Sequence, residues 1–129
     1  MNYVTRHPEG IMTDGPKQVQ KIGLKAFINN LCLEHLSTYE GRQIAARKML
    51  QRRNNVPIYV HNHMILIATH AIRHPACMFV NAQNVSHVQT EDNQTILWFL
   101  DGTRVATTIT KSHLHLLLER AMHLGELVQ

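Results

Sequence analysis

Residues 95–109 read TILWFLDGTRVATTI and predict a β-hairpin around which the fold is arranged. Two runs rich in β-branched and aromatic residues flank Asp101-Gly102, a dipeptide typical of a two-residue type I′ turn because Gly accepts a positive φ. Both faces of the first strand are apolar, with Leu97 and Phe99 on one side and Ile96, Trp98 and Leu100 on the other. We therefore expect this strand to be covered on both sides and central in its sheet.

The composition is that of a basic globular protein. The chain has 129 residues, enough for one domain with its own core, and a hydrophobic content of 44% argues against disorder. Only 17% of the residues are charged, the net charge is +4 and the isoelectric point is near 9.4. A basic balance favours an acidic partner, most simply nucleic acid.

The cysteines and the lengths of the apolar segments indicate where in the cell the protein is located. Cys32 and Cys77 are far apart and form no CxxC motif, which predicts two buried thiols in a reducing cytoplasm. Arg6, His7 and Glu9 interrupt any signal-peptide core, and no apolar run reaches the roughly 18 residues of a membrane span. We expect a cytoplasmic protein with no membrane association.

The N-terminal half is less regular. Residues 1–20 contain a candidate strand at 2–5 and are expected to be partly mobile. The apolar pattern of residues 19–36 fits either a helix or a strand followed by a turn at Asn29-Asn30. Ser37-Thr-Tyr-Glu40 has the pattern of a capping box, with Ser37 accepting from the amide three residues on and Glu40 reaching back. This predicts a helix from Ser37 to about Arg53, ended by Asn54-Asn55 and Pro57.

Strands dominate the rest of the chain. They are predicted at residues 57–61, 64–69, 77–80 and 85–90, before the hairpin. A final helix opens at Lys111-Ser112, with Ser112 or Thr110 as its cap and Gly125 weakening its end. Its apolar face consists of Leu114, Leu117, Leu118, Ala121, Leu124 and Val128. The order predicts one α+β domain over residues 1–129: an antiparallel sheet or partly open barrel, a basic helix in the N-terminal half, and a C-terminal amphipathic helix packed on the sheet.

The helix predicted at residues 37–53 carries the strongest functional signal. Its five basic residues against Glu40 give a local charge of +4, which equals the net charge of the whole chain. Tyr39, Ala46, Met49 and Leu50 form the apolar face. Arginine suits bidentate phosphate contacts and a narrow minor groove, whereas a solvated helix face is the plain alternative. The predicted DNA-binding residues are Arg42, Arg47, Lys48, Arg52 and Arg53, extended by Arg73, Arg104 and Lys111. Trp98 and Phe99 are expected in the core rather than as stacking platforms.

The remaining residues do not favour catalysis. Ten histidines are the compositional oddity, and His61-Asn-His63 spells a nuclease-like triplet, but no acidic ligands lie near it in the sequence. His113 and His115, two apart on a helix, diverge rather than converge on one metal. The chain has no P-loop, GxGxxG or GxSxG motif, and its acidic residues are few and scattered. We expect no bound metal, no cofactor and no enzymatic activity.

A set of ordered segments carries a family resemblance. These segments are Cys32, Ser37-Thr-Tyr-Glu-Gly-Arg42, Val56-Pro-Ile-Tyr-Val60, Ile65-Leu-Ile-Ala-Thr69, Arg73-His-Pro-Ala-Cys77, Phe99-Leu-Asp-Gly-Thr103 and the helix after Ser112. From Cys32 to Arg120, their order and spacing resemble the ComK family, the competence transcription factors of Gram-positive bacteria. No single segment is specific for this family, but the segments taken together in this order are. The C-terminal half is also similar in pattern to LytTR-type DNA-binding domains.

The resemblance implies a cytoplasmic transcription activator that binds AT-rich promoter DNA as a homo-oligomer, largely through the minor groove. It also implies RNA polymerase and a Clp-protease adaptor as further partners. Family members extend further at both ends, and the C-terminal extension used for adaptor recognition is missing after Gln129. We therefore expect a short ComK-like protein, and the resemblance leaves open whether it retains adaptor-driven degradation and full activator capacity. The alternative is a protein-interaction module, or a non-activating paralogue that modulates a longer ComK-type regulator.

Overall fold

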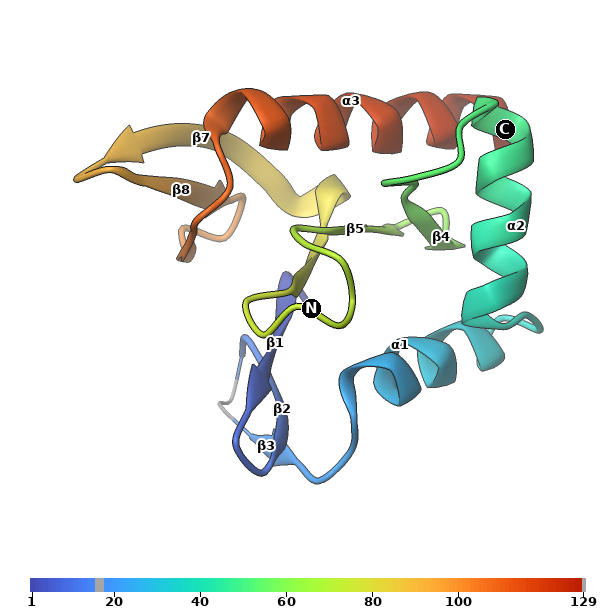
Figure 1. Ribbon diagram of the computed structural model, residues 1–129, viewed down its shortest axis with the longest axis horizontal. Coiled ribbons are helices and arrows are strands. Elements are labelled where there is room, and N and C mark those ends of the chain that lie inside the picture. Colours follow the sequence, from blue (N-terminus) through green and yellow to red (C-terminus); the bar gives the residue numbers. More distant parts are fainter. Residues whose placement is uncertain (16–17, 129) are drawn as a thin grey trace.

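The computed structural model describes residues 1–15 and 18–128 and has an α+β architecture (Figure 1). A six-stranded antiparallel sheet has the order β3-β2-β1-β6-β5-β4, and a three-stranded antiparallel sheet has the order β7-β8-β9. The first comprises β1 (Tyr3–His7), β2 (Gly10–Thr13), β3 (Val19–Gln20), β4 (Ile58–His61), β5 (Met64–Ala68) and β6 (Met78–Asn81). The second comprises β7 (Val85–Glu91), β8 (Gln94–Phe99) and β9 (Arg104–Thr107). The helices are α1 (Leu24–Leu33), α2 (Tyr39–Leu50), the 3-10 helix η1 (Ala82–Asn84) and α3 (Lys111–Val128). The predicted fold class is confirmed, and the sheets do not close into a barrel.

Strands β5 and β6 form the middle layer and are buried on both faces. Ile67 and Val80 pack with Leu114 of α3 and with the three-stranded sheet, in one core cluster. Leu66 and Phe79, on the opposite face, pack in a second cluster with α1 and α2. Burial on both sides explains why these strands are continuously apolar rather than alternating.

Helix α1 settles the alternatives for residues 19–36. Leu24, Ile28 and Cys32 recur every four residues and are all buried, whereas strand structure is limited to the two residues of β3. Asn29 does not form a turn, because its side-chain oxygen accepts a hydrogen bond of 2.9 Å from the backbone N–H of Tyr39. Asn29 therefore lies inside α1, and its side chain links α1 to the start of α2.

Both ends of α2 differ from the prediction. The N-cap is Thr38 rather than Ser37, and its hydroxyl accepts from the N–H of Gly41 at 2.9 Å. The helix ends at Leu50, because Gln51 adopts the left-handed conformation (φ 53°) and the N–H of Arg52 bonds the carbonyl of Arg47 at 3.1 Å. This is a Schellman-type ending, so Arg52 and Arg53 lie beyond the helix. Met49, predicted on the apolar face, is exposed.

The predicted hairpin is present, and β8 is the central strand of its sheet, as expected. The predicted turn type is wrong. Of Asp101 and Gly102 only Gly102 has a positive φ (88°), and Phe99 N–H bonds the Thr103 carbonyl at 2.9 Å, which makes a three-residue loop. The Asp101 carboxylate accepts from Thr103 N–H at 3.0 Å and so supports this wider loop. Leu100 falls in the loop and is exposed.

The two-residue left-handed turn lies one connection earlier, between β7 and β8. There Asp92 and Asn93 have φ values of 49° and 63°, and Glu91 pairs with Gln94. Asp and Asn tolerate this conformation better than other non-glycine residues.

Helix α3 starts and packs as expected but does not weaken at Gly125. Of the two proposed caps, Thr110 accepts from the N–H of His113 at 3.1 Å. The helix continues to Val128, which is exposed although it was predicted on the apolar face. At position 125 a Cβ would lie 3.0 Å from Cδ1 of Ile65, so the glycine lets the helix approach β5 closely.

Strand β1 occupies an interior position, between β2 and β6, and its Val4 is fully buried. Just before it, the Asn2 side-chain amide donates to Asp101 at 2.9 Å and to Thr103 at 3.0 Å, which links the two sheets. The partial mobility expected for residues 1–20 stays a prediction, and residues 16–17 lie outside the described part. Among the described residues, none of the helices combines the length and apolar character that a membrane crossing requires.

Candidate nucleic-acid interface

Four of the predicted DNA-binding residues surround one hollow at the C-terminal end of α2. Arg47, Lys48, Arg52 and Arg53 line this open hollow of about 780 Å³, together with Ile44, Gln51 and Asn54. The Schellman-type ending produces the arrangement, because it turns the chain back and places Arg52 and Arg53 beside the last helical turn. The lining residues include no carboxylate within the described chain. We call these four residues the α2 cluster.

Arg120 joins this region from α3, although it was not predicted as part of the site. The C-terminal ends of α2 and α3 meet (Figure 1), and the Arg120 guanidinium donates to the carbonyl of Asn55 at 3.2 Å. Burial, and then the positive charge of Arg52, lower the pKa of Arg120. In the sequence, only the basic character of Arg120 indicated that it could belong to this basic region. Arg52 and Arg120 are far apart in the chain and are brought together by tertiary packing alone.

Arg42 lies on the inner side of α2 and not in the hollow. Its guanidinium carbon is 5.7 Å from the centre of the Tyr59 ring on β4, which is a cation–π geometry. Its Nε is buried and has no hydrogen-bond partner within residues 1–15 and 18–128. Arg42 therefore takes part in packing α2 against the sheet.

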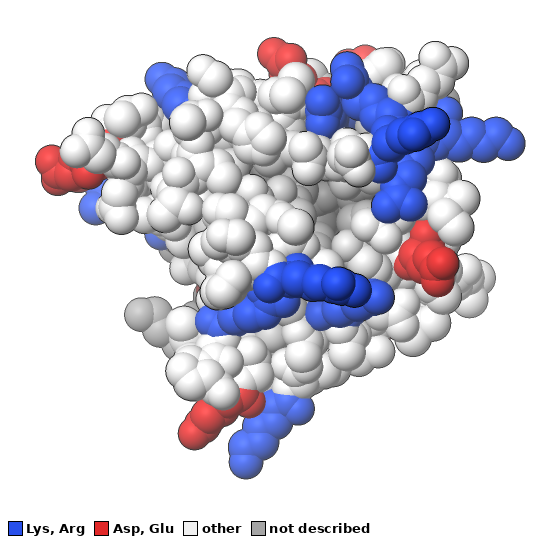
Figure 2. All heavy atoms as spheres, in the orientation of Figure 1, with Lys and Arg blue, Asp and Glu red and all other residues white. Residues whose placement is uncertain are grey.

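Arg73 lies on the loop between β5 and β6, in a second basic region. Arg6 of β1 holds this loop, because its guanidinium donates to the carbonyls of Ile72 and, at 2.6 Å, of His74. Figure 2 shows lysines and arginines gathered over the meeting ends of α2 and α3 and again across the middle of the same face. The surface is hollowed between these two basic regions.

Arg104 and Lys111 lie away from the α2 cluster. Arg104, on β9, pairs with Glu91 at 3.4 Å, and this is the one ion pair in the described part of the chain. Its guanidinium carbon is also 5.4 Å from the centre of the Trp98 ring. Lys111 begins α3, at the end of that helix opposite to the one that meets α2.

Trp98 does not offer an open stacking face. The ring of His87 is parallel to it within 10° at 5.7 Å, and Arg104 lies over it. These two residues are its cross-strand neighbours on β7 and β9, one on each side. Phe99 is buried in the core, as expected.

A protein-family model described as ComK protein matches residues 10–129. The chain belongs to the ComK family. This is a family of transcription factors rather than of enzymes, and membership supports a competence-factor-like regulator in general terms. No curated protein and no solved structure shows a significant match to the chain.

Several histidines of this ComK-family chain lie close to one another in the structure. His61 lies 4.6 Å from His35 between ring centres, and His63 lies 6.1 Å from His61. In the described ranges no three His, Cys, Asp or Glu side chains are placed to hold a metal ion.

His70 and His74 have the H-x-x-x-H spacing, which sequence reasoning passed over. They lie on the β5–β6 loop with rings stacked at 4.4 Å, and His70 also hydrogen bonds with Thr108 at 3.1 Å. Burial, and then His74, lower the pKa of His70. The arrangement fixes the loop that carries Arg73.

The two cysteines are packed in one core cluster. Cys32 and Cys77 are both buried, and burial raises the pKa of each thiol. The Cys77 thiol donates to the carbonyl of His70 at 3.2 Å. Neutral, buried thiols are poor nucleophiles, so these residues act as core packing.

Proposed function

We propose that this ComK-family chain is a cytoplasmic transcription regulator that binds double-stranded, AT-rich DNA, and that the α2 cluster makes the main contacts. The observation that carries the proposal is the gathering of Arg47, Lys48, Arg52 and Arg53 around one open hollow. None of the four forms an ion pair with an acidic residue that the structure describes. Their charge is available to phosphates, which dominate the affinity of proteins for DNA.

The residue types favour the minor groove. Three of the four cluster residues are arginines, and arginine is drawn into the narrow, strongly negative minor groove of A-tracts. Side chains at a chain reversal project from a short span of backbone, so they can enter a groove too narrow for a whole helix. We assign Arg52 and Arg53, which follow the helix end, to the groove, and Arg47 and Lys48 to the flanking phosphates.

The second basic region extends the footprint. Arg73 lies on the β5–β6 loop, which Arg6 holds through two backbone carbonyls. Figure 2 shows lysines and arginines across the middle of the face that also carries those at the meeting ends of α2 and α3. A held loop loses less conformational freedom on binding than a free one. We assign Arg73 to a phosphate beyond the site contacted by the α2 cluster.

The test is a fluorescence-anisotropy titration of the full chain at two salt concentrations. It compares an A-tract duplex, phased at one helical turn, with a GC-rich duplex of equal length. We expect tighter binding to the A-tract duplex at both salt concentrations. Weak and equal binding to the two duplexes would leave only charge attraction and would contradict the proposal.

A further inference from the structure

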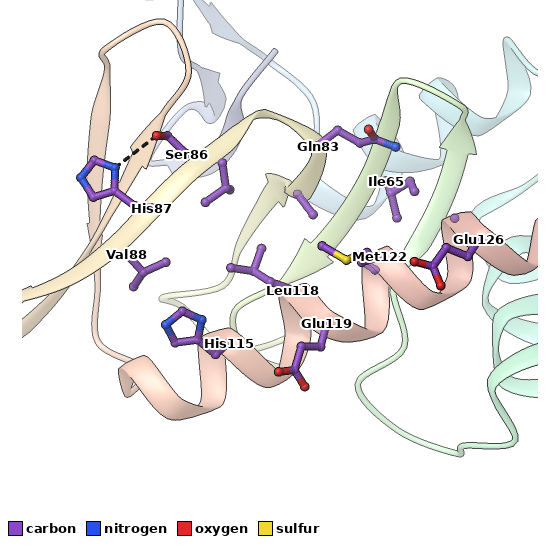
Figure 3. A pocket seen from close by; sticks show the side chains of 14 residues that line it. Ile65, Gln83, Ser86, His87, Val88, His115, Leu118, Glu119, Met122 and Glu126 are labelled. Carbon is purple, nitrogen blue, oxygen red and sulfur yellow. Dashed lines mark hydrogen bonds between the residues drawn. The ribbon is translucent and has the colours of Figure 1, made fainter.

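A groove between α3 and β7 shares no lining residue with the hollow at the α2 cluster (Figure 3). Its volume of about 550 Å³ falls in the range of roughly 300–1,000 Å³ that is common for small-molecule sites. The groove is therefore large enough for a compact organic ligand, and it takes no part in the proposed DNA site.

The interior of the groove is apolar. Ile65, Val88 and Ala121 are buried at its floor, and Leu118 and Met122 line it from α3. Met122 is 68% exposed, and its flexible, unbranched side chain can adapt to the shape of a molecule that lies against it. Such a surface favours a ligand with an aliphatic or aromatic body.

The carboxylates of the groove lie on one side of it. Glu119 and Glu126 line it from α3, and no Lys or Arg lines it within the described part of the chain. Met122 follows Glu119 by three residues and precedes Glu126 by four, so both carboxylates neighbour its side chain on the helix surface. Neither forms an ion pair with a residue that the structure describes. Two carboxylates at the edge of an apolar groove are thus available to a cation.

Polar side chains on the other side of the groove already have partners in the protein. The Gln83 side-chain amide donates to the carbonyl of Asn62 at 2.9 Å, and Ser86 hydrogen bonds with His87 at 3.2 Å. The recognition of a charged ligand group therefore falls to the α3 side, where Glu119 and Glu126 lie.

This local acidity is opposite in sign to the charge of the whole chain. The net charge is +4, and only nine of the 129 residues are acidic. Long-range attraction to the chain favours anions, so a preference of the groove for cations can come only from its own carboxylates.

We propose that this groove binds an amphiphilic cation, an organic ammonium compound with an aliphatic or aromatic body. The body lies on the apolar floor, and the ammonium group lies beside Met122, between Glu119 and Glu126. Burial of the body supplies most of the affinity, and the contacts with the carboxylates orient the ligand. The proposal concerns a small-molecule site and does not depend on DNA binding.

The test is an amide NMR titration of the full chain with decylamine at about pH 8, where alkylamines are charged and imidazoles are ordinarily neutral. We expect saturable shift changes in β7 and α3, with a dissociation constant below about 1 mM. Decanoate has the same chain length and the opposite charge, and it should bind at least about tenfold more weakly.

Two double variants separate the groove carboxylates from the net charge. Glu119→Gln with Glu126→Gln should weaken decylamine binding about tenfold, because each substitution removes one charge at the edge of the groove. Glu9→Gln with Glu34→Gln removes the same charge from exposed residues outside the groove, and it should bind decylamine as the wild type does.

A further variant fills the proposed ammonium position. Met122→Lys places an ammonium group of the chain itself between the two carboxylates, at an exposed helix position, and should abolish decylamine binding. Leu100→Lys is the matched control, since Leu100 is 71% exposed and does not line the groove. Far-UV circular dichroism of each variant shows that a loss of binding is not a loss of fold.

Several results would overturn the proposal. Absence of saturable shift changes up to about 5 mM decylamine would exclude a site for this class of ligand. Equal affinities for decylamine and decanoate would show that only apolar contact matters. Shift changes confined to other elements, or equal behaviour of Met122→Lys and Leu100→Lys, would place the binding elsewhere. Equal losses in the two double variants would assign the effect to net charge.

Discussion

Removal of charge from the α2 cluster should weaken DNA binding in a way that depends on salt. Arg47, Lys48 and Arg52 are exposed and lie around one hollow, so Arg47→Gln, Lys48→Gln and Arg52→Gln together leave the core intact. Each phosphate contact contributes about 0.9 to the slope of log K against log salt, which corresponds to about eightfold in affinity at 0.1 M salt. Loss of the two phosphate contacts assigned to Arg47 and Lys48 should lower the slope by about 1.8 and the affinity at 0.1 M about 60-fold, and loss of Arg52 from the groove should lower the affinity further.

The assay is fluorescence anisotropy with an A-tract duplex at several salt concentrations. The control is a variant that loses charge at residues outside both the hollow and the predicted DNA-binding set, namely Lys21→Gln and Lys25→Gln. It should retain the slope of the wild type within about one unit. Two results would refute the reasoning: an unchanged slope in the cluster variant, or equal losses in both variants, which would show that only net charge matters.

Three further predictions concern stability. Thr38→Ala should lower the free energy of unfolding by about 1 kcal/mol through loss of the α2 cap, whereas Thr38→Ser should not; equal urea midpoints for the two would contradict this. Gly125→Ala should gain little by itself because of its contact with Ile65, but in an Ile65→Val background it should stabilise the protein by up to about 1 kcal/mol; a double-mutant cycle with no coupling would exclude the contact. The folded-state pKa of His70 lies below 6.5, so the unfolded chain binds more protons and stability should fall as the pH drops below 6.5. Urea titrations across this range should show a smaller fall for His70→Asn, and an equal fall would show that the pH dependence does not come from His70.

Much of the fold was predictable because local patterns and tertiary structure agree. The apolar runs at β5 and β6 and the alternation in β7 are local signals, and the structure places strands there. The wrong predictions concern segments whose sequence is compatible with more than one local structure and whose actual structure is decided by a tertiary contact. Asn29 looked like a turn residue until its side chain met the start of α2, and Asp101-Gly102 formed a wider loop supported by Thr103.

Part of the candidate site could also be predicted from the sequence, because some of its residues are close together in the chain. Arg47 and Lys48 share a helix, so their proximity follows from sequence spacing. Arg52 and Arg53 reach the hollow by a different route, a left-handed Gln51 that no common capping rule predicts for glutamine. Arg120 required the packing of two helices separated by sixty residues of chain, and no local pattern contains that information.

Because β1 is an interior strand, the unit that folds begins earlier in the chain than the segment matched by the family model. The family match begins at residue 10, whereas Tyr3–His7 pairs with β2 on one side and with β6 on the other. A fragment cut at the family boundary would split the six-stranded sheet into two pieces, each with a newly opened hydrogen-bonding edge. Open edges of this kind promote aggregation, so expression boundaries for this chain should follow strand order and not sequence similarity.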